Sequence, residues 1–353
     1  MAAFFVFVHH LTPSWLPKPL FNFFQEFHVG VPVFFVLSGF LICYRYYDNV
    51  NLKKNWYVDY TINRFARIFP LYLILTAIAV LFFKEGLLEF LLNISFLRGF
   101  FVQYIFTGIH QGWSLSVEEC FYLLAPIIFM LNKRVPLIVQ AFLVLLTGFV
   151  VVKIFSTFPW HSFIPEYMFM LSYTFFGRCF EFFAGIQLAL WFKKNPEMLA
   201  TNFSKTYLGI TGILLIVLVL AEIKGGHRWG VHRFSGIFLN NFVLPIFICS
   251  MLAGLLTEKT KLRSLLQQPM MILLGKSSYA FYLLHFGFWH LLLVKAGITN
   301  FFIELSVTTL LAVLVYQYLE EPLNSYIRHW RKNVPTLKRL PVVVTPKRTS
   351  SEN

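Results

Sequence analysis

The stretch that decides the fold is "GWSLSVEECFYLLAPIIFML", which runs from Gly112 to Leu131. From Leu123 onward it is long and apolar enough to lie in a membrane, yet Glu118 and Glu119 stand near its start. A carboxylate at the edge of the hydrocarbon is costly and is usually kept only where it has a partner or a function. The role of these acids depends on the side of the membrane that they face.

The composition predicts an all-α polytopic membrane protein. Of the 353 residues, 58% are hydrophobic and only 13% are charged, whereas a soluble domain has about 25% charged residues. Apolar runs of about 20 residues recur along the whole chain, and such runs are too long for barrel strands. The 4 cysteines lie in or beside these runs without ligand or disulfide spacing, so we expect no metal site from them.

The net charge of +14 comes from basic residues that cluster in short segments between the apolar runs. This pattern is typical of cytoplasmic loops, so we expect the lipid bilayer as a partner and no nucleic acid. We expect about ten transmembrane helices, at roughly 2–11, 29–44, 66–83, 114–131, 135–155, 171–192, 206–222, 236–256, 272–293 and 300–318.

The segment 87–106, "LLEFLLNISFLRGFFVQYIF", is long enough to cross but is interrupted by polar residues. If it does not cross, about two thirds of the 30 Lys and Arg residues fall on one side of the membrane. If it crosses, that bias is lost. The positive-inside rule therefore favours a re-entrant or interfacial segment and two cytoplasmic termini in the cell membrane. We expect a membrane-embedded domain over 1–325 and a basic cytoplasmic tail over 326–353.

The first residues, "MAAFFVFVHHL", have neither the basic region nor the cleavage site of a signal peptide. As a helix, residues 2–11 would extend about 15 Å, which is half of a hydrocarbon core of about 30 Å. We expect this segment to be the second half of a transmembrane helix whose first half lies upstream.

This topology places His9 and His10 at the outer end of the first span and Glu118 at the outer end of the fourth. An imidazole at this depth is a candidate general base, a metal ligand or an ordinary interfacial residue. A carboxylate within reach of it would fix its tautomer and stabilise the imidazolium. Glu118 shares a helical face with Tyr122, whereas Glu119 points about 100° away and fits a helix-start acid.

Arg64 and Arg67 in "INRFARIFPLY" are three residues apart, on one helical face at the inner mouth of the third span. Two guanidinium groups on one face form a good phosphate clamp, and the alternative is ordinary positive-inside charge. Arg178 and Glu181 in a later span either neutralise each other or serve a substrate or gating role. His285 in "GKSSYAFYLLHF" is a further candidate, deep in its span.

Seven segments in order resemble the integral-membrane acyltransferase-3 family, whose bacterial members O-acylate cell-surface glycans. They are "AAFFVFVHH" (2–10), "HVGVPVFFVLSGFLI" (28–42), "RFARIFPLY" (64–72), "WSLSVEECFYLLAP" (113–126), "GRCFEFFAGIQLA" (177–189), "GKSSYAFYLLHF" (275–286) and "LEEP" (319–322). The fourth of these begins with Trp113, a further candidate site residue. The set covers nearly the whole chain.

The resemblance implies a transferase that moves an acyl group, in the simplest case acetyl, from cytoplasmic acyl-CoA to a hydroxyl of a cell-surface or exported carbohydrate. It implies no metal. By position in the motifs, the catalytic histidine falls on His10, the arginine pair on Arg64 and Arg67, and the acid on Glu118. The family's SGNH domain is lacking, and its usual cation about eleven residues before the histidine would precede Met1.

The mechanism expected is that the arginine pair holds the phosphates of acyl-CoA while His10, oriented by Glu118, acts on the acceptor. His10 would deprotonate the acceptor hydroxyl or carry the acyl group itself, and the sequence leaves both routes open. One alternative is a transporter or flippase for a glycolipid or small anion, which predicts repeated halves that are not found. Another is an unrelated membrane acyltransferase that would use the late His285.

Overall fold

The computed structural model describes residues 1–50, 54–157, 162–194 and 204–333. Among these residues the regular structure is helical, and the only β interaction is an isolated bridge between Phe101 and Phe163. Eight helices are long and apolar enough to cross a membrane. The all-α polytopic membrane fold expected from the sequence is confirmed.

The helices follow one another along the chain with short connections. They are α1 (Ala2–His10), α2 (Lys18–Gln25), α3 (Gly30–Tyr46), α4 (Lys54–Phe83), α5 (Leu87–Ile94), α6 (Trp113–Leu131), α7 (Leu137–Thr157), α8 (Tyr167–Tyr173), α9 (Phe175–Lys194), α10 (Lys205–Ile223), α11 (Phe234–Phe238), α12 (Leu244–Thr257), α13 (Lys261–Leu266), α14 (Pro269–Lys276), α15 (Ser278–Leu284), α16 (Phe288–Lys295), α17 (Phe301–Val315) and α18 (Glu321–Asn333). A π-helical segment, Tyr316–Glu320, joins α17 to α18 as one continuous helix.

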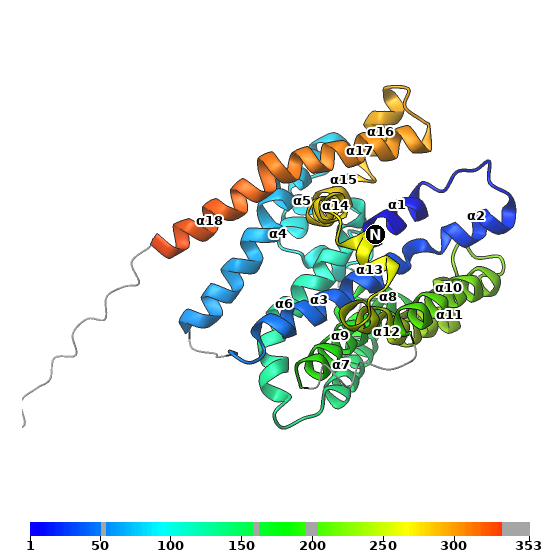
Figure 1. The fold of residues 1–353 in the computed structure, drawn as a ribbon. Coiled ribbons are helices and arrows are strands. Elements are labelled where there is room, and N and C mark those ends of the chain that lie inside the picture. Colours follow the sequence, from blue (N-terminus) through cyan, green and yellow to red (C-terminus); the bar gives the residue numbers. More distant parts are fainter. Residues whose placement is uncertain (51–53, 158–161, 195–203, 334–353) are drawn as a thin grey trace, which may run out of the picture.

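The helices α3 and α6 run through the middle of the molecule, between the α17–α18 helix on one side and α7, α9, α10 and α12 on the other (Figure 1). The closest packing is between α3 and α9, where glycines let the two backbones approach. A Cβ on Gly39 would lie 2.2 Å from the carbonyl oxygen of Phe182, and one on Gly185 would lie 2.0 Å from that of Val36. Small residues play this part at helix contacts in membranes, where backbone proximity supplies van der Waals attraction.

Two of the ten expected spans take another form, so the structure does not confirm that number. Residues 2–11 give the nine-residue α1, and residues 272–293 are divided among α14, α15 and α16. The last break falls at Gly287, whose φ of 80° lies outside the helical region. An apolar run of sufficient length is therefore not sufficient for a continuous helix.

The segment 87–106 forms α5 followed by turns, and not a helix long enough to cross. Its centre is Arg98, which is fully buried and donates hydrogen bonds to Asn93 Oδ1 (2.7 Å), to the Ile109 carbonyl (2.6 Å) and to the Thr107 carbonyl. Irregular backbone at membrane depth is tolerated only where the protein itself satisfies the polar groups. Arg98 provides that satisfaction here.

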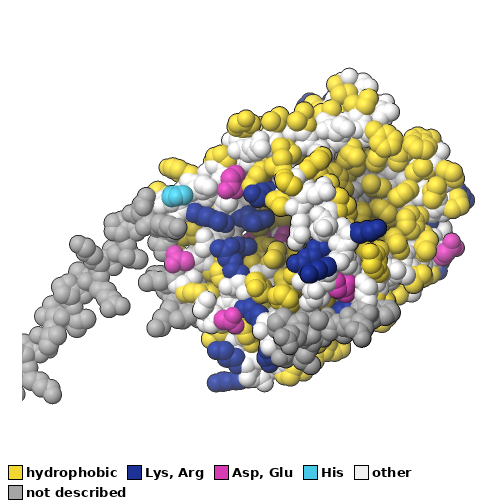
Figure 2. Space-filling model, viewed as in Figure 1, with side chains coloured by type: hydrophobic (Ala, Val, Ile, Leu, Met, Phe, Trp, Pro, Cys, Tyr) yellow, Lys and Arg dark blue, Asp and Glu magenta, His cyan; other side chains and the backbone are white. Residues whose placement is uncertain are grey.

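The helix α18 continues to Asn333, so the expected domain boundary at residues 325 and 326 falls inside it. Residues 334–353 of the expected tail lie outside the described residues. Lys and Arg side chains gather near the beginning of α4 and the end of α18, while the right-hand part of this face is largely hydrophobic (Figure 2).

We predict that Arg98→Met destabilises the fold by about 3 kcal/mol or more, because it leaves several buried acceptors without a donor. The measurement is the thermal unfolding midpoint of the purified protein in detergent. Lys153→Met is the control, since Lys153 is an exposed cation at the end of a helix. Equal midpoints for the two variants would contradict the role given to Arg98.

Candidate active site

Two polar cavities lie in line along α3 and α6. The first, which we call the arginine cavity, has a volume of about 330 Å³, and its polar lining consists of Ser38, Arg64, Arg67, Ser114, Glu118, Tyr122, Ser278, Tyr279 and Tyr282. The second, the histidine cavity, has a volume of about 520 Å³ and is lined by polar or aromatic side chains that include His9, His10, His28, His110, Gln111, Trp113, Glu166, Arg178, Arg228, Trp229, His232 and Tyr282. Val31 and Tyr282 line both, so the two cavities share a wall.

Arg64 and Arg67 reach the arginine cavity together from one face of α4, as their spacing predicts. The guanidinium of Arg64 lies over the rings of Tyr46 and Tyr122, at 5.6 and 5.8 Å from their centroids. Its Nη2 is 3.5 Å from the Tyr46 hydroxyl. These contacts hold the cation by its flat faces, which leaves its edge for a ligand.

Two further arginines belong to this group, although the sequence analysis counted them only as topology charges. Arg45 ends α3 and lies over the Tyr46 ring at 5.4 Å, and Arg328 lies on α18. Arg45, Arg64 and Arg67 all lie close enough to Arg328 for their charges to repel it. Within the described part of the chain, none of the four forms an ion pair. Such a cluster is suited to a ligand with several negative charges.

Glu118 lies in the arginine cavity and not beside His10, which corrects the expected pairing. Its carboxylate accepts hydrogen bonds from the hydroxyls of Ser38 and Tyr122. The physical reason is depth along α6: Trp113 lines the histidine cavity, and Glu118 is five residues, about 7.5 Å, further along the helix. Glu119 lines neither cavity.

His9 and His10 both line the histidine cavity, but their surroundings differ. Nδ1 of His9 donates to the Gln25 carbonyl at 2.5 Å, so this ring is tied to the backbone. The His10 ring stacks on Phe286 at 4.5 Å and makes no hydrogen bond with any described residue. His10 is therefore the imidazole of this pair that is open to a ligand.

His285 packs against His10, with ring centroids 5.3 Å apart. It is fully buried and donates from Nδ1 to the Tyr282 carbonyl at 2.8 Å, and its Nε2 has no partner in the described structure. Its neighbourhood brings a residue from late in the chain to the first helix. The sequence gave no means of placing these two imidazoles side by side.

Arg178 and Glu181 form a buried two-bond ion pair, with nitrogen–oxygen distances of 2.8 and 2.7 Å. Of the two readings of this spacing, the structure therefore contains the neutralising pair. Arg178 also lines the histidine cavity, with its guanidinium 5.2 Å from the Phe35 ring centroid and 5.9 Å from that of Trp113. Trp113, the remaining candidate from the sequence, is thus part of the same wall.

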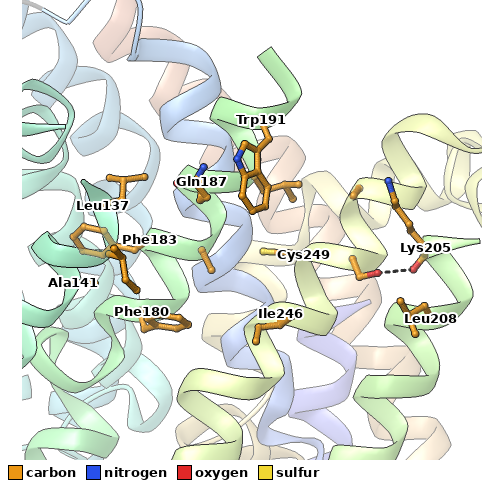
Figure 3. Close-up of a pocket in the computed structure, with 15 residues that line it drawn as sticks. Leu137, Ala141, Phe180, Phe183, Gln187, Trp191, Lys205, Leu208, Ile246 and Cys249 are labelled. Carbon is orange, nitrogen blue, oxygen red and sulfur yellow. Dashed lines mark hydrogen bonds between the residues drawn. The ribbon is translucent and has the colours of Figure 1, made fainter. Parts of the chain in front are cut away.

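A third cavity, of about 490 Å³, lies between α7, α9, α10 and α12 (Figure 3). Its walls are mostly apolar, with Phe180, Phe183 and Ile246 on them, and no described lining residue is His, Asp, Glu or Arg. Ser250 Oγ donates to the Lys205 carbonyl at 3.1 Å at its edge. This cavity lacks acid–base groups, so we place the candidate site in the other two. Among the described residues, no three His, Cys, Asp or Glu side chains converge as metal ligands would.

The fold and these cavities define a polytopic helical membrane protein that has an anion site in line with an imidazole cluster. The chain belongs to the membrane acyltransferase family, because the model described as "Acyltransferase domain" matches residues 1–317. It is 26% identical over 387 residues to "Putative O-acetyltransferase SACOL0978" of Staphylococcus aureus strain COL, covering 96% of this chain and 59% of that protein.

A second relative is "O-acetyltransferase OatA" of Staphylococcus aureus strain NCTC 8325 / PS 47, at 25% identity over 365 residues. That alignment covers 90% of this chain and 55% of the relative. The chain thus spans less than two thirds of the length of the curated relatives that it matches. No solved structure matches it.

The arginine cluster leads to a prediction about anion binding. Arg328→Met should weaken the binding of coenzyme A by about 10-fold or more, because a charge-assisted hydrogen bond contributes about 1.5–3 kcal/mol. Binding is measured by calorimetry on the purified protein. Lys261→Met, which removes an exposed cation outside the cluster, is the control. Equal affinities for the two variants would exclude Arg328 from the anion site.

Proposed function

We propose that this protein transfers an acyl group, in the simplest case acetyl, from acyl-CoA to a hydroxyl of a carbohydrate at the outer face of the cell membrane. The observation that carries the proposal is the shared wall between a cluster of unpaired arginines and a cluster of imidazoles. The donor's charged end and the reacting hydroxyl would then approach from opposite sides of the membrane. The names of the relatives support acetyl as the transferred group.

The donor would bind through its phosphates, which are the charges that the four arginines are suited to hold. Arg64 and Arg67 stand at the cavity itself, and Arg45 and Arg328 lie beside them. The arm that carries the thioester would extend along the arginine cavity. There Glu118, already held by two hydroxyls, would accept hydrogen bonds from the amide groups of that arm.

The thioester would meet His10 where the two cavities share a wall. Tyr282 stands at this wall, with its hydroxyl 2.7 Å from Ser114 Oγ and 3.1 Å from the Gln111 carbonyl. His10 would then take the proton of the acceptor hydroxyl or carry the acyl group between donor and acceptor. The lack of a hydrogen bond to its ring within the described structure supports this role, because a bound group can occupy that position.

The acceptor would bind in the histidine cavity, whose outer part carries aromatic and cationic groups. The Arg228 guanidinium lies 4.7 Å from the centroid of the Trp229 ring, and Trp229 Nε1 donates to Gln25 Oε1 at 3.2 Å. Burial and the nearby His227 lower the pKa of His232, so its ring is favoured in the neutral form. Flat aromatic rings with hydrogen-bonding neighbours suit a sugar, and Arg228 suits an anionic one.

The test is the turnover of acetyl-CoA by membranes that contain the protein. We predict that His10→Ala lowers kcat by about 10²–10⁴, the usual contribution of a general base, and leaves coenzyme A affinity unchanged. His329→Ala, which removes an exposed imidazole on α18, should retain the wild-type rate. Full activity in His10→Ala would contradict the proposed role of His10. Coenzyme A that binds and crosses the membrane without acyl transfer would instead support a transporter.

A further inference from the structure

A carboxylate–imidazole pair stands on the wall of the histidine cavity, formed by Glu26 and His28 at the junction of α2 and α3. Glu26 Oε2 is 3.1 Å from His28 Nε2, and the other carboxylate oxygen accepts a hydrogen bond from the Gly230 amide at 2.9 Å. The Glu26 carboxylate is 0% exposed, whereas the His28 side chain is 15% exposed and lines the cavity. The imidazole therefore stands between a buried acid and open space.

The hydrogen bonds of this pair determine which nitrogen of His28 can act as a base. An ionised carboxylate accepts and cannot donate, so His28 Nε2 carries the proton that is shared with Glu26. The other ring nitrogen, Nδ1, is then left with its lone pair. A buried carboxylate in this position holds the imidazole in one tautomer and stabilises the imidazolium that forms when the base takes up a proton.

The pair lies close to the histidine already assigned to the reaction. His28 is 5.4 Å from His9 between ring centroids, and His9 is 4.8 Å from His10. The rings of His28 and His10 are therefore within about 10 Å of each other, on the wall of one cavity. Unlike His28, His10 has no carboxylate among its hydrogen-bonding partners in the described structure.

We propose that His28 is the base that deprotonates the incoming nucleophile and that Glu26 is its positioning residue, an assignment that rests on the proposed function. The O–H bond of the acceptor breaks as His28 Nδ1 takes the proton. The acceptor oxygen forms a bond to the acyl carbon, and the bond from that carbon to its carrier breaks. The carrier is the thioester sulfur in direct transfer, or a His10 nitrogen if His10 holds the acyl group.

The electron pair of the broken bond leaves with the carrier, and His28 afterwards returns the proton to it directly or through water. His10 then acts on the donor side of the reaction and His28 on the acceptor side. This division explains why the histidine cavity holds two imidazoles of different kinds, one tied to a carboxylate and one open.

The most informative variant is Glu26→Gln, because it preserves the shape of the side chain and an oxygen for the Gly230 amide. The new amide would donate to His28 Nε2, so that Nδ1 would carry the ring proton and could no longer act as a base. His28→Ala removes the base itself. The matched control is Glu304→Gln, because Glu304 Oε1 and His290 Nδ1 form a similar pair at 2.6 Å and neither residue lines the cavity.

The experiment compares two nucleophiles in their protein-dependent cleavage of acetyl-CoA by the full chain in membranes. Water requires a base, whereas hydroxylamine is already a strong neutral nucleophile and does not. We expect Glu26→Gln and His28→Ala to lower the rate with water by about 100-fold or more, the range of general-base catalysis. The rate with hydroxylamine and the affinity for coenzyme A should change by less than about threefold. Glu304→Gln should match the wild type with both nucleophiles.

Equal losses with water and with hydroxylamine would overturn the assignment, because they would indicate a structural role for the pair. Unchanged hydrolysis in both variants would also overturn it. If the wild type cleaves acetyl-CoA with neither nucleophile, the proposed function itself fails, and the assignment of His28 fails with it. A His10→Ala variant that loses both reactions, beside a Glu26→Gln variant that loses only hydrolysis, would separate the two roles.

Discussion

The hydrogen bonds between the start of α6 and Tyr282 determine the layout of the site. Gln111 donates from Nε2 to the carbonyls of Tyr282 (2.7 Å) and Leu283 (2.8 Å), and Ser114 pairs with the Tyr282 hydroxyl. These bonds attach the broken segment α14–α16 to α6. In a hydrocarbon environment such polar groups must find partners within the protein, so the junction is both costly to lose and specific in its geometry. Both cavities are built against it.

The shared wall explains how one chain can present opposite chemistry to the two ends of the site. On one side, cations without counter-charges create a strong positive field in a partly enclosed space, which favours a polyanion. On the other side, imidazoles and aromatic rings offer proton transfer and flat surfaces for binding. Glu118 belongs to the first environment and Glu26 to the second. Assigning each acid to its cavity changes which histidine has a carboxylate partner: it is His28, whereas His10 remains open.

The sequence predicted the fold class well, because hydropathy and the positive-inside rule depend on composition more than on detailed packing. It also predicted the pairing of Arg64 with Arg67, since their spacing fixes a common helical face. It could not predict the break at Gly287, which depends on backbone dihedrals. Arg45 and Arg328 were counted as loop and tail charges, because their convergence requires α3 and α18 to meet at α4. The expected contact between Glu118 and His10 failed for a similar reason, since two residues near one membrane face can differ in depth by more than a helical turn.

The central claim is that donor and acceptor approach the shared wall from opposite sides of the membrane. The most direct measurement uses proteoliposomes in which the orientation of the protein is known from protease accessibility of an engineered site. Radiolabelled acetyl-CoA is added either outside or inside. The account predicts that acetyl transfer occurs only when acetyl-CoA is on the side of the four arginines, and that the product appears on the other side. Transfer at equal rates from both sides, or product on the side of the donor, would contradict it.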